Sequence, residues 1–225
     1  MTNKRVFQAL DFDRTIFRTR TMQQKLIDAL ALYRPGLEKE IEKESIAHGA
    51  RGESFFIFQY LRERLGTVDF PDFMTQFRAS TPVDALVKDG AHERLAYAFS
   101  QPGWSGGIMT YGAPEDQRMK LDMLDMAKYP HYITSTPDKG AIIASWLQPD
   151  GTFLLPDEYG GGVVDVVTLD DDKLRAFQGL PKQAYGMWLT KDAEALTQVP
   201  QELQDRVVPV KDLFESIDHL KNILT

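Results

Sequence analysis

The sequence predicts an α/β fold in which a parallel β-sheet lies between helices and a mostly helical insert follows the first strand. Three observations predict it. Residues 6–10 form a short apolar segment that precedes a long stretch of helical periodicity. Beyond residue 103, further apolar segments of strand length alternate with helical segments. The two regions are separated by residues 101–107, which are rich in proline, glycine and serine and therefore favour turns.

The composition limits what kind of protein this is. The chain has 225 residues, which suits one large α/β domain or a core domain with a smaller insert. Hydrophobic residues make up 43% and charged residues 26%, a balance typical of ordered globular proteins. The absence of cysteine excludes disulfides, iron–sulfur clusters, thiolate zinc sites and a cysteine nucleophile.

The charge and hydropathy patterns indicate where the protein works. The net charge is -7, which disfavours nonspecific binding to nucleic acid or to an anionic membrane. No apolar run approaches the roughly 18 residues that a membrane-spanning helix needs. The apolar part of the N-terminal segment is too short for a signal peptide. We therefore expect a soluble, cytoplasmic protein that binds neither nucleic acid nor membrane.

The first third of the chain is predicted to be one buried strand followed by helices. Val6–Leu10 is the strand, and Asp11 follows it directly. Helical spacing then extends to about residue 100, with breaks at Pro35-Gly36 and at Arg51-Gly52-Glu53. The aromatic residues of this block are interpreted as its core. This organisation predicts a helical domain of residues 17–100, inserted into a core domain made of residues 1–16 and 101–225.

The remainder of the chain alternates strands with helices. Strands are predicted at residues 107–111, 132–135, 163–169, 184–189 and 207–210, and helices at residues 114–128, 138–147 and 213–224. Residues 150–162 are long enough for a hairpin around Pro156 and Asp157. This alternation is typical of a Rossmann-like three-layer core, in which parallel strands are joined by right-handed crossovers.

Polar residues follow four of the predicted strands. In open parallel sheets, ligands bind at the carboxyl ends of the strands, so these residues are expected at one edge. They are Asp11, Asp13 and Thr15 after the first strand, Thr110 at the second, Lys139 after the third, and Asp170, Asp171 and Asp172 at the fourth. Any one of them has an ordinary structural explanation, such as capping a turn or lying in solvent. The prediction of a site depends on their joint order.

These residue types suit phosphoryl transfer. The reaction needs a nucleophile, a proton donor for the leaving group, and cations or hydrogen-bond donors for the phosphoryl oxygens. Asp11 is predicted to attack phosphorus, since a carboxylate is already ionised at pH 7. Asp13 would protonate the leaving oxygen and then deprotonate the hydrolytic water. Thr110, Lys139 and the backbone N–H groups after Asp11 would bind the phosphate.

In order and in context, these residues resemble the four motifs of the haloacid dehalogenase-like (HAD) hydrolase superfamily. The motifs are DxDxT after a hydrophobic strand, a strand ending in Thr or Ser, a Lys at a helix start, and a strand ending in paired acidic residues. Here they are residues 11–15, Thr110, Lys139, and Asp171 with Asp172. The resemblance covers the core and not the insert, whose position between the first two motifs resembles that of a C1-type cap.

The resemblance implies a Mg²⁺-dependent phosphatase that hydrolyses a small phosphorylated metabolite through an aspartyl-phosphate intermediate. It implies Mg²⁺ ligands at Asp11, at the backbone carbonyl of Asp13 and at Asp171, with Asp172 in support. Members of the family that transfer phosphoryl groups to water generally carry the second aspartate of the first motif, here Asp13. Dehalogenases generally lack it, so Asp13 favours a phosphatase.

Several alternatives stay open at this point. Asp170 stands where the family usually has an apolar residue, so the metal-binding register is uncertain by one position. Lys120 is a second candidate for the phosphate lysine, but it is expected two turns into a helix and facing solvent, whereas Lys139 is expected at a helix start. A phosphomutase would use the same residues. A catalytically silent binding protein could retain the fold.

Overall fold

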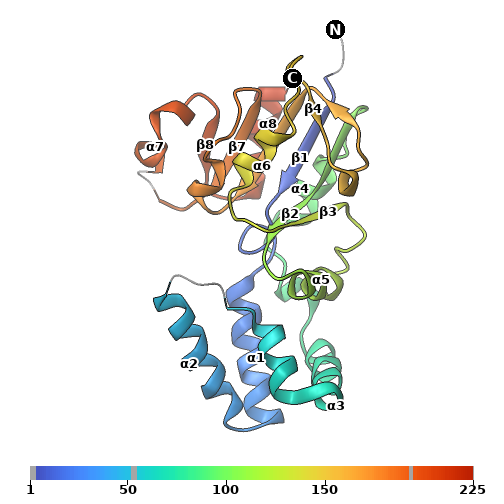
Figure 1. Cartoon of the computed structure of the whole chain (residues 1–225), viewed down its shortest axis with the longest axis vertical. Helices are drawn as coiled ribbons and strands as arrows, with labels where there is room; N and C mark the ends of the chain where they lie inside the picture. The colour runs from blue at the N-terminus through green and yellow to red at the C-terminus, as the bar shows by residue number, and fades with distance from the viewer. Residues whose placement is uncertain (1–3, 52–54, 193–194, 225) are drawn as a thin grey trace. The chain divides into compact units, whose positions relative to one another are not determined.

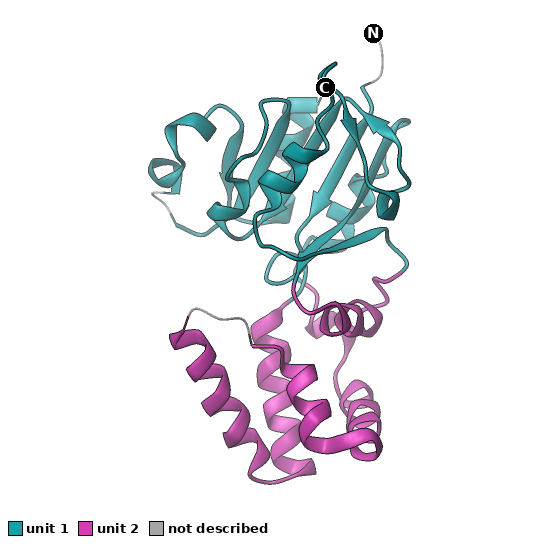
Figure 2. Ribbon diagram, viewed as in Figure 1, with its two compact units in different colours: residues 1–17, 88–111, 128–225 teal, residues 18–87, 112–127 magenta. Residues whose placement is uncertain are grey.

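The computed structural model describes residues 4–51, 55–192 and 195–224, and Figure 1 shows the elements along the chain. Of the predicted break at Arg51-Gly52-Glu53, Gly52 and Glu53 lie outside the described residues. The chain forms two compact units, coloured in Figure 2. Unit 1 comprises residues 1–17, 88–111 and 128–225, and unit 2 comprises residues 18–87 and 112–127.

Unit 1 contains a six-stranded sheet in the order β3-β2-β1-β6-β7-β8, in which every neighbouring pair is parallel. The predicted α/β fold class is confirmed. The strands are β1 (Val6–Leu10), β2 (Trp104–Tyr111), β3 (His131–Thr134), β6 (Val166–Asp171), β7 (Ala184–Leu189) and β8 (Val207–Val210). All five residues of β1 are buried, because a central strand of such a sheet has helices on both faces.

The helices of unit 1 cover both faces of this sheet. They are α4 (Ala91–Tyr97), α6 (Lys139–Ser145), α7 (Ala195–Gln198) and α8 (Leu213–Leu224), with short 3₁₀ helices η2 (Asp157–Tyr159), η3 (Leu174–Phe177) and η4 (Gln201–Leu203). Side chains alternate along a strand. Phe7 therefore shares one apolar core with Ile143 of α6 and Phe177 of η3, while Gln8 meets Arg94 of α4.

The predicted strand at residues 163–169 is two strands. β5 (Val163–Val164) pairs antiparallel with β4 (Phe153–Leu154), which agrees with the expected hairpin around Pro156 and Asp157. Asp165 interrupts the run between β5 and β6. Its carboxylate accepts hydrogen bonds from the backbone N–H of Arg5 at 2.8 Å and from the Arg5 guanidinium at 2.7 Å. This local pairing ends the hairpin and begins the parallel strand.

Unit 2 is helical. It contains α1 (Thr19–Tyr33), α2 (Leu37–Ala50), α3 (Ile57–Ser80), η1 (Val83–Ala85) and α5 (Pro114–Met123). The helix α3 is interrupted at Gly66, whose φ of 74° is a left-handed conformation that glycine adopts easily. Phe58 is buried in this unit, and Phe55, Phe56 and Tyr60 are partly buried. Of these four aromatic residues, Phe58 agrees best with the expectation that they form the core of the helical block.

The units differ from the predicted domains by one residue at the first boundary, where residue 17 belongs to unit 1, and by two longer segments. Residues 88–100, which include α4, belong to unit 1, and residues 112–127, which include α5, belong to unit 2. Arg94 of α4 forms a buried ion pair with Asp170 of β6. Asp116 of α5 accepts hydrogen bonds from the N–H groups of Phe58 and Gln59 at the start of α3. Helical periodicity in a sequence does not reveal which unit a helix packs in.

In the part of the chain that the structure describes, no helix has the length and apolar character needed to cross a membrane.

Candidate active site

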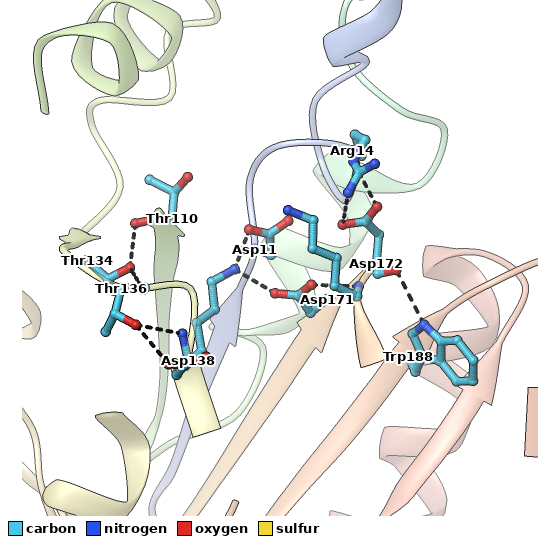
Figure 3. Close-up of polar contacts among 11 residues, drawn as sticks. Asp11, Arg14, Thr110, Thr134, Thr136, Asp138, Asp171, Asp172 and Trp188 are labelled. Carbon is cyan, nitrogen blue, oxygen red and sulfur yellow. Dashed lines mark hydrogen bonds and ion pairs between the residues drawn. The ribbon is translucent and has the colours of Figure 1, made fainter. Parts of the chain in front are cut away.

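Asp11 and Asp171 lie at the carboxyl edge of the sheet in unit 1 (Figure 3), and Lys139 contacts both. Asp11 follows the last residue of β1, and Asp171 is the last residue of the neighbouring β6. The Nζ atom of Lys139 donates a hydrogen bond to Oδ1 of Asp11, and another to Oδ2 of Asp171 at 2.6 Å. The three side chains are 8%, 4% and 2% exposed respectively, so the contacts are shielded from solvent.

Lys139 is held in place by the start of α6. A side chain on the next residue, Gly140, would put its Cβ 2.4 Å from the carbonyl oxygen of Gln178. Glycine therefore allows the first turn of α6 to lie directly against the residues after η3. The preceding loop is fixed by Thr134, whose hydroxyl donates to the Thr136 carbonyl at 2.7 Å, and by Thr136, whose hydroxyl donates to Asp138 at 3.0 Å.

Burial and the neighbouring charges act in opposite directions on these groups. Burial raises the pKa of Asp11, the Lys139 cation lowers it, and the Asp171 carboxylate raises it, with a result of about 6. Burial lowers the pKa of Lys139, but the carboxylates of Asp11 and Asp171 more than offset this, so the pKa of Lys139 lies above its ordinary value. At neutral pH, Lys139 is thus a fixed cation between two carboxyl groups.

A third carboxylate completes the group. One carboxylate oxygen from each of Asp11, Asp171 and Asp172 lies within 4.8 Å of the other two. Asp172 follows the end of β6, and its side chain forms an ion pair with Arg14, at 2.9 Å from Nε to Oδ2. Burial raises the pKa of Asp172. Hard oxygen donors at this spacing suit Mg²⁺, which prefers carboxylates to nitrogen or sulfur ligands.

Asp13 and Thr110 lie at the same edge. Asp13 is in the turn after β1, where it forms a backbone bridge with Phe17, and its charge contributes to the raised pKa of Asp11. Its carboxylate is not in the three-carboxylate group found among the described residues; the predicted metal ligand at this position is its backbone carbonyl. Thr110 is fully buried near the end of β2, which is paired with β1, and its carbonyl accepts a hydrogen bond from Thr134 (Figure 3).

The structure separates the three consecutive aspartates. Asp170 is fully buried, and its carboxylate accepts hydrogen bonds from Arg94 at 2.7 and 3.0 Å and from the Ser216 hydroxyl. Asp171 points to the opposite side, toward Lys139, because side chains alternate along a strand. The geometry therefore favours the register in which Asp171 and Asp172 face the candidate metal site.

The expectation that Lys120 faces solvent is wrong. Lys120 is 8% exposed, on the α5 helix of unit 2, where its charge acts on the nearby Asp116. The α5 helix packs against α3, so the face that carries Lys120 is covered. Lys139 is the lysine that contacts both Asp11 and Asp171.

Sequence reasoning missed two arginines that contact the acidic residues. Arg14 lies inside the first motif, at a position where the motif allows any residue. Arg94 could have been found from the helical spacing, because the apolar residues Ala91, Leu95 and Ala98 lie on the same face of its helix. All three are buried in the structure. A charged residue on such an apolar face requires a buried partner of opposite charge.

Comparison with known proteins identifies relatives by fold but not by sequence. No protein-family model matches the sequence, and no curated protein matches it. A solved structure from Burkholderia xenovorans, described as a haloacid dehalogenase-like hydrolase, is 14% identical, covers 96% of this chain and 98% of its own, and superposes with a TM-score of 0.63. A Thermotoga maritima protein described as a β-phosphoglucomutase is 16% identical, covers 96% and 99%, and has a TM-score of 0.53.

The L-2-haloacid dehalogenase from Xanthobacter autotrophicus is 14% identical, covers 96% of this chain and 98% of its own, and has a TM-score of 0.51. Sequence identities this low support a shared fold and nothing finer, and the three structures are described as proteins with different activities. The resemblance drawn from the four motifs is confirmed at this level: the chain has the fold of the haloacid dehalogenase-like hydrolases.

Proposed function

We propose that this protein is a Mg²⁺-dependent phosphatase that hydrolyses a small phosphomonoester through an aspartyl-phosphate on Asp11. One observation carries the proposal. The Lys139 ammonium bonds both Asp11 and Asp171, in a buried group that also includes Asp172. A nucleophilic carboxylate, a cation for the phosphate and further carboxylates for a metal are the parts that this reaction needs.

The residues present fit Mg²⁺. Asp11, Asp171 and Asp172 would hold the ion with the backbone carbonyl of Asp13, and water would complete the coordination. When bound, Mg²⁺ neutralises charge on the phosphate and orients it for in-line attack.

The chain's own residues supply the covalent and proton-transfer steps. A carboxylate oxygen of Asp11 forms a bond to phosphorus as the bond to the leaving oxygen breaks, and Asp13 gives its proton to that oxygen. Asp13 then takes a proton from water as the water oxygen attacks phosphorus. The bond between phosphorus and Asp11 breaks, which releases phosphate and restores the carboxylate. Thr110 and Lys139 donate hydrogen bonds to the phosphoryl oxygens.

Asp13 favours phosphoryl transfer over dehalogenation. A halide leaves as a stable anion and needs no proton, whereas an alkoxide leaves poorly unless an acid protonates it. A carboxyl group two residues after the nucleophile therefore has a direct role in phosphate ester hydrolysis.

The helical unit supports a small substrate. Most of it, residues 18–87, lies between Asp11 and Thr110 in the sequence, the position of a C1-type cap in the family that the motifs resemble. A cap of this kind selects its substrate and excludes water during the reaction. We therefore propose a phosphorylated metabolite as the substrate, and not a phosphoprotein.

The decisive experiment is phosphate release from p-nitrophenyl phosphate, with Mg²⁺ and with EDTA. Wild type should release phosphate only with Mg²⁺, and Asp11→Asn should lose at least about 10³-fold in kcat, because an amide cannot replace the nucleophile. Asp150→Asn, at an exposed turn position, is the matched control and should behave as wild type.

Four other outcomes would contradict the proposal. Activity that persists in EDTA would contradict the role of the metal, and activity that persists in Asp11→Asn would contradict the nucleophile. Interconversion of sugar phosphate isomers without free phosphate would indicate a phosphomutase. Failure to hydrolyse any member of a metabolite panel, with Mg²⁺ and phosphate both bound in calorimetry, would indicate a binding protein that retains the fold.

A further inference from the structure

Arg14 contacts the candidate metal site from within the first motif. Its Nε atom lies 2.9 Å from Oδ2 of Asp172, and its Nη2 atom donates to Oδ1 at 3.5 Å (Figure 3). The Arg14 side chain is 39% exposed and that of Asp172 is 17% exposed. Lys173 and Lys88 also lower the pKa of Asp172, each by less than Arg14 does. Arg14 is therefore the principal cation acting on the third carboxylate.

The backbone at this position does not call for an arginine. Arg14 has a φ of 68°, in the left-handed region that glycine adopts without strain and that a residue with a Cβ atom adopts at a cost. Its N–H donates to the Phe17 carbonyl at 2.9 Å, a bond that any residue except proline can make. The turn would form at least as well with glycine, so the guanidinium is the part of Arg14 that has no backbone explanation.

The guanidinium changes what the site attracts. A divalent cation is attracted by the carboxylates of Asp11, Asp171 and Asp172 and repelled by Arg14. A phosphate dianion experiences both effects with the opposite sign. Loss of Arg14 makes the group more negative by one charge and frees Asp172 from its ion pair. Both changes favour the cation and disfavour the anion.

We propose that Arg14 sets the balance between cation and phosphate binding: by pairing with Asp172, it weakens the hold of the site on Mg²⁺ and strengthens its hold on phosphate. The inference rests on the proposed function for the identity of the two ligands. It adds a specificity-determining residue at a position that the four motifs leave free.

The test is a pair of calorimetric titrations on Arg14→Gly, which suits the left-handed backbone and so preserves the turn. Mg²⁺ alone should bind with a Kd lower than that of wild type by roughly 3- to 10-fold. Inorganic phosphate, titrated at saturating Mg²⁺, should bind with a Kd higher by a similar factor. Arg14→Lys keeps the charge and should move both values back toward wild type.

Arg5→Gln is the matched control. Arg5 pairs with Asp165 at 2.7 Å just before β1 and β6, the opposite ends of the same two strands, so its loss removes one positive charge and one Arg–Asp pair away from the site. Both Kd values should stay at the wild-type level in this variant.

Opposite shifts in the two Kd values are the signature of a charge balance. Unchanged values in Arg14→Gly, or weaker binding of both ligands, would overturn the inference, since the second result indicates damaged geometry. Failure of wild type to bind Mg²⁺ or phosphate would overturn it as well. The titrations need no turnover, so opposite shifts in a protein that does not hydrolyse phosphate esters would support the inference while the proposed function fails.

Discussion

At Asp11, burial and the neighbouring charges compete, and their balance decides the protonation of the proposed nucleophile. Burial alone would favour the neutral acid, while Lys139 favours the carboxylate, and the pKa comes to about 6 instead of the ordinary 3.8. A carboxyl with this pKa is mostly ionised at neutral pH and protonated in mild acid. The same group therefore affects both reactivity and stability.

Stability without metal should depend on pH through this residue. Between pH 4 and 6, folded protein holds a proton on Asp11 that the unfolded chain has already released. The free energy of unfolding therefore falls as pH rises across this range, by up to about 3 kcal/mol. The Asn side chain in Asp11→Asn cannot titrate, so this variant does not lose stability through residue 11 as pH rises.

Urea denaturation in EDTA at pH 4.5, 5.5 and 6.5 checks this. The stability of Asp11→Asn relative to wild type should increase with pH, whereas that of Asp150→Asn should change little over the same range. A constant difference between Asp11→Asn and wild type would show that Asp11 has an ordinary pKa.

Individual residues show where sequence reasoning ends. The joint order of the strands predicts that Asp11, Lys139 and Asp171 meet, and they do. The direction in which each side chain of residues 170–172 points depends on where β6 ends. The amino-acid sequence does not specify that position. The Arg14–Asp172 pair joins residues 158 positions apart, and no local pattern predicts such a contact.

Among the elements, β6 connects the candidate site with the core. Asp170 points away from the site and binds Arg94 of α4 and Ser216 of α8, while Arg94 also donates to Gln8 of β1 at 2.7 Å. The carbonyl of Asp170 accepts the N–H of Asp11 at 2.8 Å. This buried polar network therefore fixes the strand that carries Asp171 against the strand that precedes Asp11.

Arg94→Met should destabilise the protein by about 3–5 kcal/mol, because it leaves the Asp170 carboxylate buried without a positively charged partner. The double variant Arg94→Met with Asp170→Leu should recover most of that loss, since an apolar pair requires no charge compensation. Urea denaturation of both single variants and the double variant gives the coupling energy. A double variant as unstable as the sum of the two singles would contradict this account.

Periodicity predicts the elements well where they are regular and poorly where a specific residue ends them. The bounds of β1, β7 and β8 agree with the prediction. The helix predicted at residues 114–128 ends at Met123, and Asp125 just beyond has a left-handed φ of 54°. Near the end of the stretch of predicted helical spacing, which extends to about residue 100, the α-helix covers only residues 91–97 and follows Gly90 with its φ of 79°. These ends depend on backbone conformations that periodicity does not report.

At the scale of the whole molecule, the chain enters the helical unit twice. Residues 18–87 form most of it, and residues 112–127 return to it after β2. Asp116 joins the two segments, because its carboxylate accepts the N–H groups of Phe58 and Gln59 at 3.2 and 3.0 Å. The α3 helix is thus capped by a side chain from a distant part of the sequence.

Asp116→Ala should therefore cost about 1–2 kcal/mol of stability, the usual effect of losing a cap at a helix start. The neighbouring Glu115 pairs with Arg62 but is 69% exposed, so Glu115→Ala should cost less than about 1 kcal/mol. Chemical denaturation of the two variants checks the difference. Equal losses would show that the Asp116 cap adds nothing beyond a surface ion pair.

The second entry into the helical unit could not be predicted from the sequence. A helix flanked by two strands of a parallel sheet normally covers that sheet, and α5 has this position between β2 and β3. The amphipathic pattern of α5 shows that one face is buried, but it does not show whether that face packs against the sheet or against α3. The long insert after β1 was predictable because it separates two strands that must pair.

The central place of β1 affects how the protein folds during synthesis. This strand leaves the ribosome long before its two neighbours, which begin at Trp104 and Val166. At about 5–20 residues per second, a nascent chain waits seconds before either neighbour exists. Until then, the mostly apolar segment at residues 6–10 has no sheet to join. Nascent chains that stop short of β6 should therefore depend on chaperones to stay out of aggregates.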